Sequence, residues 1–291
     1  MIIPRPLPRV IPRPSPAWAA AIFGPRIDPD AQAYIAAITA AGADLGLLND
    51  EAITKKAISD SIIERKDLGI WELERRTYLP IWGVAAANAI CQRSLESGEF
   101  VNSPTMAAGH VAFDGSTQFF DTKFNVASGG LTNASACNGC LWWDIGTNHQ
   151  SGIFTAAGTT LLHNYTITPS VRSEICGSSR RYDTEVSASS DREGIFSANR
   201  RSGVTRHRIM RDSGISESDD FTADAAGVMP NGDFYWGARN RLDTSSVDQH
   251  GPQKMGIMWH ALGLPDDLDE AFATNLKTLW KTCTDLTFPA P

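Results

Sequence analysis

The chain has 291 residues, of which 42% are hydrophobic and 20% are charged, and its formal net charge is −7 at pH 7. This composition is typical of a globular protein with a sizeable core, and it excludes an intrinsically disordered chain. No apolar run approaches the ~20 residues of a membrane-spanning helix. We also expect no secretory signal peptide, because six prolines precede the short apolar run at residues 17–24.

Residues 1–27 are predicted to form an extended anchoring arm rich in proline and arginine. Proline lacks a backbone donor and fixes φ, so this stretch favours a polyproline-like conformation over a helix or a central strand. The alternative is a disordered leader, but the apolar residues favour an arm that becomes ordered in a groove of a neighbouring subunit. The residues expected to contact that partner are Arg5, Leu7, Arg9, Val10, Ile11, Arg13 and Trp18.

The arm is basic and the rest of the chain is acidic. Residues 1–27 contain four arginines and no acid, whereas the whole chain is negative. This asymmetry indicates that arm and body contact different surfaces.

Residues 28–78 are predicted to form a small helical cap. The first helix begins at Asp28-Pro29, an N-cap followed by proline, and ends at Gly42. A second helix is expected from Asp50, and a third short one passes through Trp71 towards Tyr78. Such short amphipathic helices need a partner surface, so we expect them to pack against the rest of the fold.

Residues 79–264 are predicted to form the body of the protein, a β-sandwich or jelly roll. Segment 111–122 (VAFDGSTQFFDT) has apolar residues two apart, a polar corner and a second extended run, which is typical of a hairpin. The first strand is expected at 78–83, on a sheet edge because of Pro80. Further short strands bounded by Gly, Asn, Asp or Ser are expected at 140–145, 152–156, 161–167, 180–186, 194–199, 204–211, 233–238 and 254–262.

Residues 265–291 are predicted to form a helix and tail packed on the sandwich, near the N-terminal helices. Apolar side chains follow Pro265 at helical spacing. They are Leu268, Phe272, Leu276, Leu279, Trp280 and Cys283.

Three motifs in this order resemble a structural family of tailed bacteriophages whose members carry a concanavalin A-like, laminin G-like jelly roll. They are segment 111–122, segment 194–200 (GIFSANR) and segment 230–240 (PNGDFYWGARN), followed by the strand and helix at the end of the chain. The resemblance covers about residues 28–285, and the segment 67–71 (DLGIW) is similar to the helical preface of such modules. It implies a virion protein of head or tail, made in the host cytoplasm. The proline and arginine arm departs from the family pattern.

No catalytic, metal or cofactor site is expected. A glycoside hydrolase needs two carboxylates facing each other across a sugar cleft. The one close pair, Glu72 and Glu74, lies in a predicted helical segment beside Arg75 and Arg76, which favours solvated ion pairs. The six histidines have no nucleophile context, and the phosphate-loop motif is absent.

The five cysteines are an odd number scattered along the chain, which favours reduced thiols over a disulfide framework. Cys137 and Cys140 have the spacing of half a zinc or redox site, but no second pair lies near them. The Asn-Gly between them is typical of a turn.

Two aromatic pairs are candidate glycan contacts: Trp142 with Trp143, and Tyr235 with Trp236. Adjacent strand residues point to opposite faces, so one ring of each pair can meet a sugar while the other fills the core. The alternative is that both rings pack within the assembly. Nucleic acid is not expected as a partner, because acids interrupt the arginine-rich stretch 172–211.

The sequence thus favours a non-enzymatic structural component of a phage virion, either a head decoration or a tail or fibre protein. Its arm would bind capsid or tail subunits, and the protein would form a homo-oligomer. The first alternative is an adhesin of the same fold that binds a host-surface glycan. The second is a jelly-roll enzyme that degrades polysaccharide.

Overall fold

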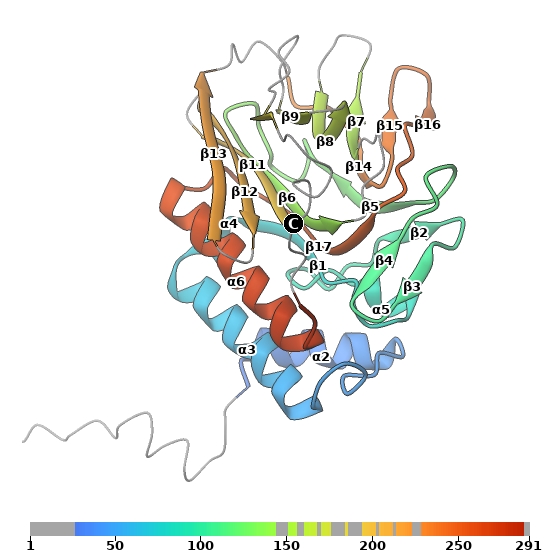
Figure 1. Cartoon of the computed structure of the whole chain (residues 1–291), viewed down its shortest axis with the longest axis vertical. Coiled ribbons are helices and arrows are strands. Elements are labelled where there is room, and N and C mark those ends of the chain that lie inside the picture. The colour runs from blue at the N-terminus through green and yellow to red at the C-terminus, as the bar shows by residue number, and fades with distance from the viewer. Residues whose placement is uncertain are drawn as a thin grey trace, which may run out of the picture.

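The computed structural model describes residues 27–143, 151–155, 160–167, 170–175, 184–185, 194–201, 204–211, 214–222 and 228–287. Two sheets stack face to face, and helices cover one side of the stack (Figure 1). This confirms the predicted mainly β sandwich with an N-terminal helical cap and a C-terminal helix. The predicted arm, apart from Ile27, lies outside the described residues.

The two sheets are antiparallel, except where β15 runs parallel to β7. The first sheet has the order β13 (Gly214–Thr222), β12 (Val204–Arg211), β11 (Gly194–Arg201), β6 (Ser135–Trp143), β17 (Lys254–Ala261), β4 (His110–Ala112) and β3 (Thr105–Ala107), with β1 (Glu74–Tyr78) also paired to β17. The second sheet has the order β10 (Thr184–Glu185), β9 (Ser170–Ile175), β8 (Thr160–Ile167), β7 (Ser151–Phe154), β14 (Asp233–Trp236), β5 (Phe119–Asn125) and β2 (Glu99–Val101), with β15 (Arg239–Arg241) and β16 (Ser246–Asp248) at its side.

Strand β6 shows how the sequence builds two apolar cores. Its side chains alternate, so Cys137 and Leu141 face the helices, whereas Cys140 and Trp142 face the second sheet. The outer core lies between the first sheet and the helices, and the inner core lies between the sheets. Cys137 and Cys140 therefore point to opposite faces. All four described cysteines, Cys91 included, are buried.

Segment 111–122 is not a hairpin, which corrects the sequence-based expectation. Strand β4 belongs to the first sheet and β5 to the second, so the connection crosses from one sheet to the other. The Asp114 carboxylate accepts hydrogen bonds from the backbone N–H groups of Ser116 (2.9 Å), Thr117 (3.0 Å) and Gln118 (3.1 Å). These hydrogen bonds hold the polar corner in an Asx turn, but a turn of this kind does not determine which strand the chain joins next. Here the turn lies within a crossover between the two sheets.

The N-terminal helices are α2 (Pro29–Ala40), α3 (Glu51–Asp67), α4 (Ile70–Leu73) and α5 (Ala85–Asn88). Asp28 and Asp50 cap α2 and α3 as predicted, each accepting two backbone N–H groups.

The expected third helix is much shorter than predicted, and the first strand spans residues 74–78 in place of the predicted 78–83. Helix α4 ends at Leu73, and β1 then pairs with β17, placing Tyr78 opposite Met258. The Glu74 carboxylate accepts two hydrogen bonds from Arg65, at 2.9 and 2.8 Å, and both side chains are fully buried. Glu74 is thus a buried link between α3 and β1 and not the solvated ion pair that the sequence suggested.

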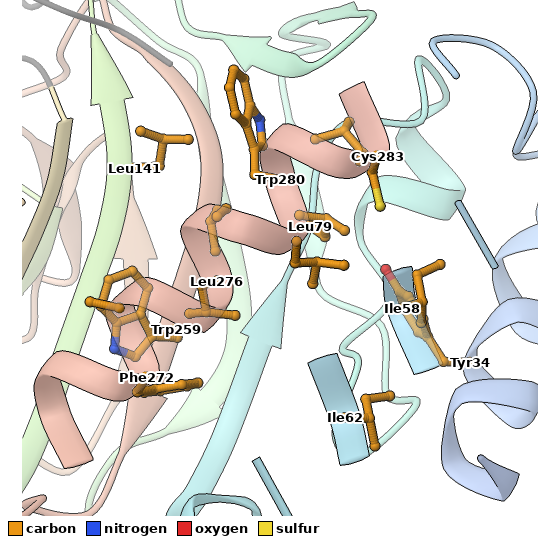
Figure 2. Close-up of a cluster of buried hydrophobic side chains, with 14 of the residues drawn as sticks. Tyr34, Ile58, Ile62, Leu79, Leu141, Trp259, Phe272, Leu276, Trp280 and Cys283 are labelled. Carbon is orange, nitrogen blue, oxygen red and sulfur yellow. The ribbon is translucent and has the colours of Figure 1, made fainter. Parts of the chain in front are cut away.

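Helix α6 (Asp266–Thr284) packs on the first sheet beside α3, as predicted (Figure 2). The Trp280 Nε1 donates a hydrogen bond to the Gly109 carbonyl at 3.0 Å. The Arg208 guanidinium, on β12, binds the buried Asp269 carboxylate of α6 at 2.7 Å. Ser61 on α3 donates to Asn275 on α6 at 2.7 Å, so the N-terminal and C-terminal helices are joined directly. None of the described helices is long and apolar enough to cross a membrane.

Placing a charge in this contact should destabilise the whole fold. Leu276→Asp or Trp280→Asp would bury an unpaired carboxylate against the first sheet, at a cost of several kcal/mol. Denaturant unfolding should show this loss, whereas Thr278→Asp, at an exposed position of the same helix, should unfold like wild type. A Trp280→Asp protein that is soluble and has wild-type stability would contradict the described packing of α6.

His260, on β17, is fully buried in the inner core among aromatic rings. Its ring centroid lies 4.5 Å from that of Phe234, 5.4 Å from that of Trp236 and 5.5 Å from that of Phe124. Neither ring nitrogen has a hydrogen-bond partner among the described residues. Burial, followed by the nearby Arg76 charge, lowers the pKa of His260 from 6.5 to about 3.

Stability should therefore fall when the solution is acidified. Because the pKa of His260 is lower in the folded state, the unfolded chain binds more protons between pH 3 and 6.5. The free energy of unfolding should lose about 3 kcal/mol between pH 6.5 and pH 4 through this group. His260→Phe should remove that part of the pH dependence, as measured by urea unfolding at a series of pH values. Parallel pH profiles for the two proteins would show that His260 is not buried as a neutral ring.

Candidate functional site

The outer face of the second sheet carries a group of aromatic and charged side chains. On β5 and β14 the side chains alternate, so Phe120 and Phe234 enter the inner core. Phe119, Asp121 and Tyr235 point the other way, and Tyr235 lies opposite Asp121 in the strand register. Residues distant in the sequence thus meet on one face.

Tyr235 is held by its neighbours. Its ring stacks on that of Phe119, with centroids 4.7 Å apart and planes at 27°. Phe119 in turn lies 5.9 Å from the ring of His250. The ring of Tyr235 remains half-exposed, and this support fixes its orientation.

Lys123 organises the charges beside this ring. Its Nζ lies 2.8 Å from carboxylate oxygens of both Asp121 and Glu99. These hydrogen bonds, the one to Asp121 first, raise the pKa of Lys123. The Asp121 side chain is only 8% exposed, and it also accepts the Lys123 backbone N–H at 2.8 Å. Asp121 is thus fully engaged within the protein.

A pocket of about 410 Å³ opens next to Tyr235, between the end of β5, the start of β14 and the β15–β16 hairpin. Its lining residues are Asn125, Gly232, Asp233, Tyr235, Asn240, Leu242, Ser245, Ser246 and Val247. They combine one aromatic ring with amides, hydroxyls and two aliphatic side chains. The pocket is therefore mostly polar and has one aromatic wall.

Asp233 is the one charged residue among those that line the pocket. Burial first, and then the charge of Asp121, raises the pKa of its carboxyl group. Within the described part of the chain, no hydrogen bond reaches this carboxylate. A half-buried carboxylate without a protein donor is available to a ligand that donates hydrogen bonds.

Local hydrogen bonds build the walls of the pocket. The Asn240 Nδ2 donates to the Asp233 backbone carbonyl at 2.8 Å, and the Asn125 Nδ2 donates to Asn231 at 2.9 Å. A Cβ at Gly232 would lie 2.7 Å from the end of the Leu242 side chain, so a larger residue here would require Leu242 to shift. These bonds hold β15 to the start of β14, and they hold the segment just before β14 to the end of β5.

The arginines next to the pocket are already paired. Arg239 forms two hydrogen bonds of 2.7 Å with Asp248, and Arg241 binds Asp243 at 3.0 and 2.6 Å. Both guanidinium groups lie over the ring of Phe154, at 5.0 and 5.3 Å from its centroid. The positive charge of this hairpin is thus neutralised within the protein.

Of the four aromatic residues predicted as glycan contacts, Tyr235 lines the pocket. Trp142 and Trp236 are fully buried in the inner core, so they are the ring of each pair that fills the core, and neither is available to a sugar. Trp143 is half-buried, and its ring packs edge-on against Trp280 (5.8 Å) and His110 (5.2 Å). Helix α6 therefore covers the face of the first sheet on which Trp143 was expected to contact a sugar.

The residues predicted to bind a partner through the arm lie outside the described residues. They are Arg5, Leu7, Arg9, Val10, Ile11, Arg13 and Trp18.

Sequence reasoning missed most of the pocket. Asp233 and Asn240 flank the aromatic pair within segment 230–240, and this arrangement of polar residues around Tyr235 is a signal that could have identified them. Asn125, Ser245 and Ser246 carry no comparable signal, since only the fold brings them together. Among the described residues, no group of three or more His, Cys, Asp or Glu side chains is placed to hold a metal ion.

No family model matches the sequence, and no curated protein matches it. Among solved structures, the receptor binding domain of botulinum neurotoxin C/D mosaic serotype is 10% identical, with a TM-score of 0.45 over 70% of this chain and 51% of that chain. Trypanosoma rangeli sialidase is 10% identical, with a TM-score of 0.43 over 78% of this chain and 38% of that chain. The VIP36 exoplasmic/lumenal domain, in a Ca²⁺/Man2-bound form, is 10% identical, with a TM-score of 0.34 over 67% of this chain and 92% of that chain. The chain thus spans about half the length of the toxin domain.

Proposed function

We propose that this protein is a non-catalytic carbohydrate-binding module whose binding site is the pocket beside Tyr235. The observation that carries the proposal is the lining of that pocket, which combines a fixed, half-exposed aromatic ring with a carboxylate, amides and hydroxyls. A sugar ring has an apolar face of C–H groups and an edge of hydroxyl groups. Aromatic and hydrogen-bonding side chains together match these two features.

The size of the pocket supports a small ligand. Its volume of about 410 Å³ lies in the lower half of the ~300–1,000 Å³ found for small-molecule sites. We infer that it holds one or two sugar units at the end of a glycan. The pocket is also open to solvent, so the rest of a longer chain can extend away from the protein.

The charges of the site support binding over hydrolysis. Glycoside hydrolysis needs two carboxylates on either side of the scissile bond. Asp233 lines the pocket, but Asp121 is buried and held by Lys123. Asp233 is the single carboxylate among the described residues that line the pocket; it can orient a sugar, but no second carboxylate of that lining is placed to serve as the partner that cleavage requires.

Removal of the Tyr235 ring should weaken glycan binding. Tyr235→Ala deletes the aromatic wall, and we expect affinity to fall roughly tenfold or more. Tyr235→Phe keeps the stack on Phe119 and should retain most of the affinity. A glycan array would identify ligands, and isothermal titration calorimetry would measure affinities, with Thr278→Ala on α6 as a remote control. Absence of binding to every glycan, or unchanged affinity of Tyr235→Ala, would contradict the proposal.

A second candidate function is assembly into a virion through the arm. Its support is the sequence of residues 1–27, which is basic and rich in proline on a chain of net charge −7. We propose that this arm binds neighbouring capsid or tail subunits and that the protein is repeated by symmetry. Glycan binding and virion attachment are compatible, since they use different parts of the chain.

Deletion of residues 1–27 should separate folding from assembly. The shortened protein should remain folded, because Asp28 still caps α2 and contacts α3 through Lys66 at 2.7 Å. We expect it to be absent from purified particles, as measured by quantitative mass spectrometry. Substitution of Arg5, Arg9 and Arg13 by glutamate should cause most of the same loss. If purified particles contain the shortened protein in the same amount as the full-length protein, the sandwich and not the arm makes the attachment.

A further inference from the structure

We propose that the pocket beside Tyr235 selects uncharged saccharides that present two neighbouring hydroxyl groups, and that it rejects saccharides carrying a carboxylate or sulfate at that position. This inference rests on the proposed function and adds the chemical class of the ligand. It follows from the hydrogen-bonding groups left open in the pocket and from the charges around it.

The open groups of the pocket are mainly acceptors. The Asp233 carboxylate provides two oxygens that no described residue occupies. The Asn240 amide uses one N–H of its Nδ2 on the Asp233 carbonyl, which leaves its oxygen as an acceptor and one further N–H as a donor. The Asn125 amide is already engaged within the protein: its Nδ2 donates to Asn231, and its oxygen accepts the Ser128 N–H. A ligand must therefore bring donors, and a pair of neighbouring hydroxyl groups can donate to the two oxygens of Asp233.

The surrounding charges oppose an anionic ligand. Asp121 lies opposite Tyr235 on β5, Glu99 lies opposite Asp121 on β2, and Lys123 is shared between their two carboxylates. Arg239 and Arg241 are bound to Asp248 and Asp243, so neither is a spare cation for an incoming acid. A carboxylate or sulfate entering the pocket would lose its water and meet the Asp233 charge without a partner.

The pocket also has an arrangement that suits an uncharged sugar. Tyr235 stands two residues after Asp233, and both side chains line the same cavity. A sugar edge bound to the carboxylate therefore has an aromatic ring within reach of its apolar face. Ser245 supplies a hydroxyl that can both donate and accept, which fits a remaining sugar hydroxyl. The Ser246 hydroxyl already shares a hydrogen bond of 2.7 Å with Thr244 Oγ1.

The test compares matched saccharides on the full chain. Neutral oligosaccharides and their sialylated, uronic acid and sulfated counterparts would be printed on one glycan array. For the neutral and acidic pair that gives the strongest signal, titration calorimetry would then measure both affinities. We expect the neutral member to bind at least about tenfold more tightly than its acidic counterpart. Asp233→Asn should weaken binding of the neutral ligand and reduce the ratio of neutral to acidic affinity to about threefold or less. Asp60→Asn, an exposed carboxylate on α3, makes the same change of net charge and should leave the ratio unchanged.

A second measurement needs no variant. High salt screens the repulsion of the acidic ligand, so the ratio in the wild-type protein should narrow as ionic strength rises. Equal or tighter binding of the acidic member, with Tyr235→Ala still abolishing binding, would overturn this inference and leave the proposed function standing. A ratio insensitive to both Asp233→Asn and salt would also overturn it. Failure of every saccharide to bind would overturn the proposed function itself.

Discussion

The first sheet is apolar on both faces, and the rest of the structure depends on covering them. Strand β6 sends Leu141 to one side and Trp142 to the other, and both are fully buried. Exposure of either face would cost the hydrophobic free energy that stabilises the fold. The second sheet covers one face, and helices from both ends of the chain cover the other. The outer face of the second sheet is left to polar and aromatic side chains, and the candidate site lies there.

Close packing of rings on the backbone makes this arrangement specific. A Cβ at Gly139 would lie 2.0 Å from the Trp259 ring, and one at Gly256 would lie 2.5 Å from the Nε1 of Trp280. The buried pair of Arg65 and Glu74 adds a polar constraint, because removal of one member would leave a buried charge without its partner. The helices and the first sheet therefore pack in one specific arrangement. The crossover at 112–119 carries the chain from the first sheet to the second sheet, which bears the pocket.

The features that are local in sequence could be predicted, and those that depend on distant pairing could not. Caps at Asp28 and Asp50, the apolar stripe of α6 and strand β12 follow from neighbouring residues alone. Segment 111–122 has the local pattern of a hairpin, but its two strands find partners in different sheets. Likewise Tyr235 could be predicted from strand alternation, whereas its pocket joins residues from β5 and from the hairpin after β14, about a hundred positions apart. Periodicity carries no information on such pairing.

Helix α2 and the pocket lie on opposite sides of the sandwich, which gives the molecule a direction. Asp28 is bound to α3 through Ser59 and Lys66, on the helical side of the sandwich, while the pocket is lined by residues of β5, β14 and the β15–β16 hairpin in the second sheet. Figure 1 shows α3 and the β15–β16 hairpin on opposite sides of the molecule. A copy held through residues before Asp28 would therefore turn its pocket away from whatever holds it. Many copies fixed in this way on one support would present their pockets in parallel. Weak single contacts would then add up to strong adhesion through multivalency.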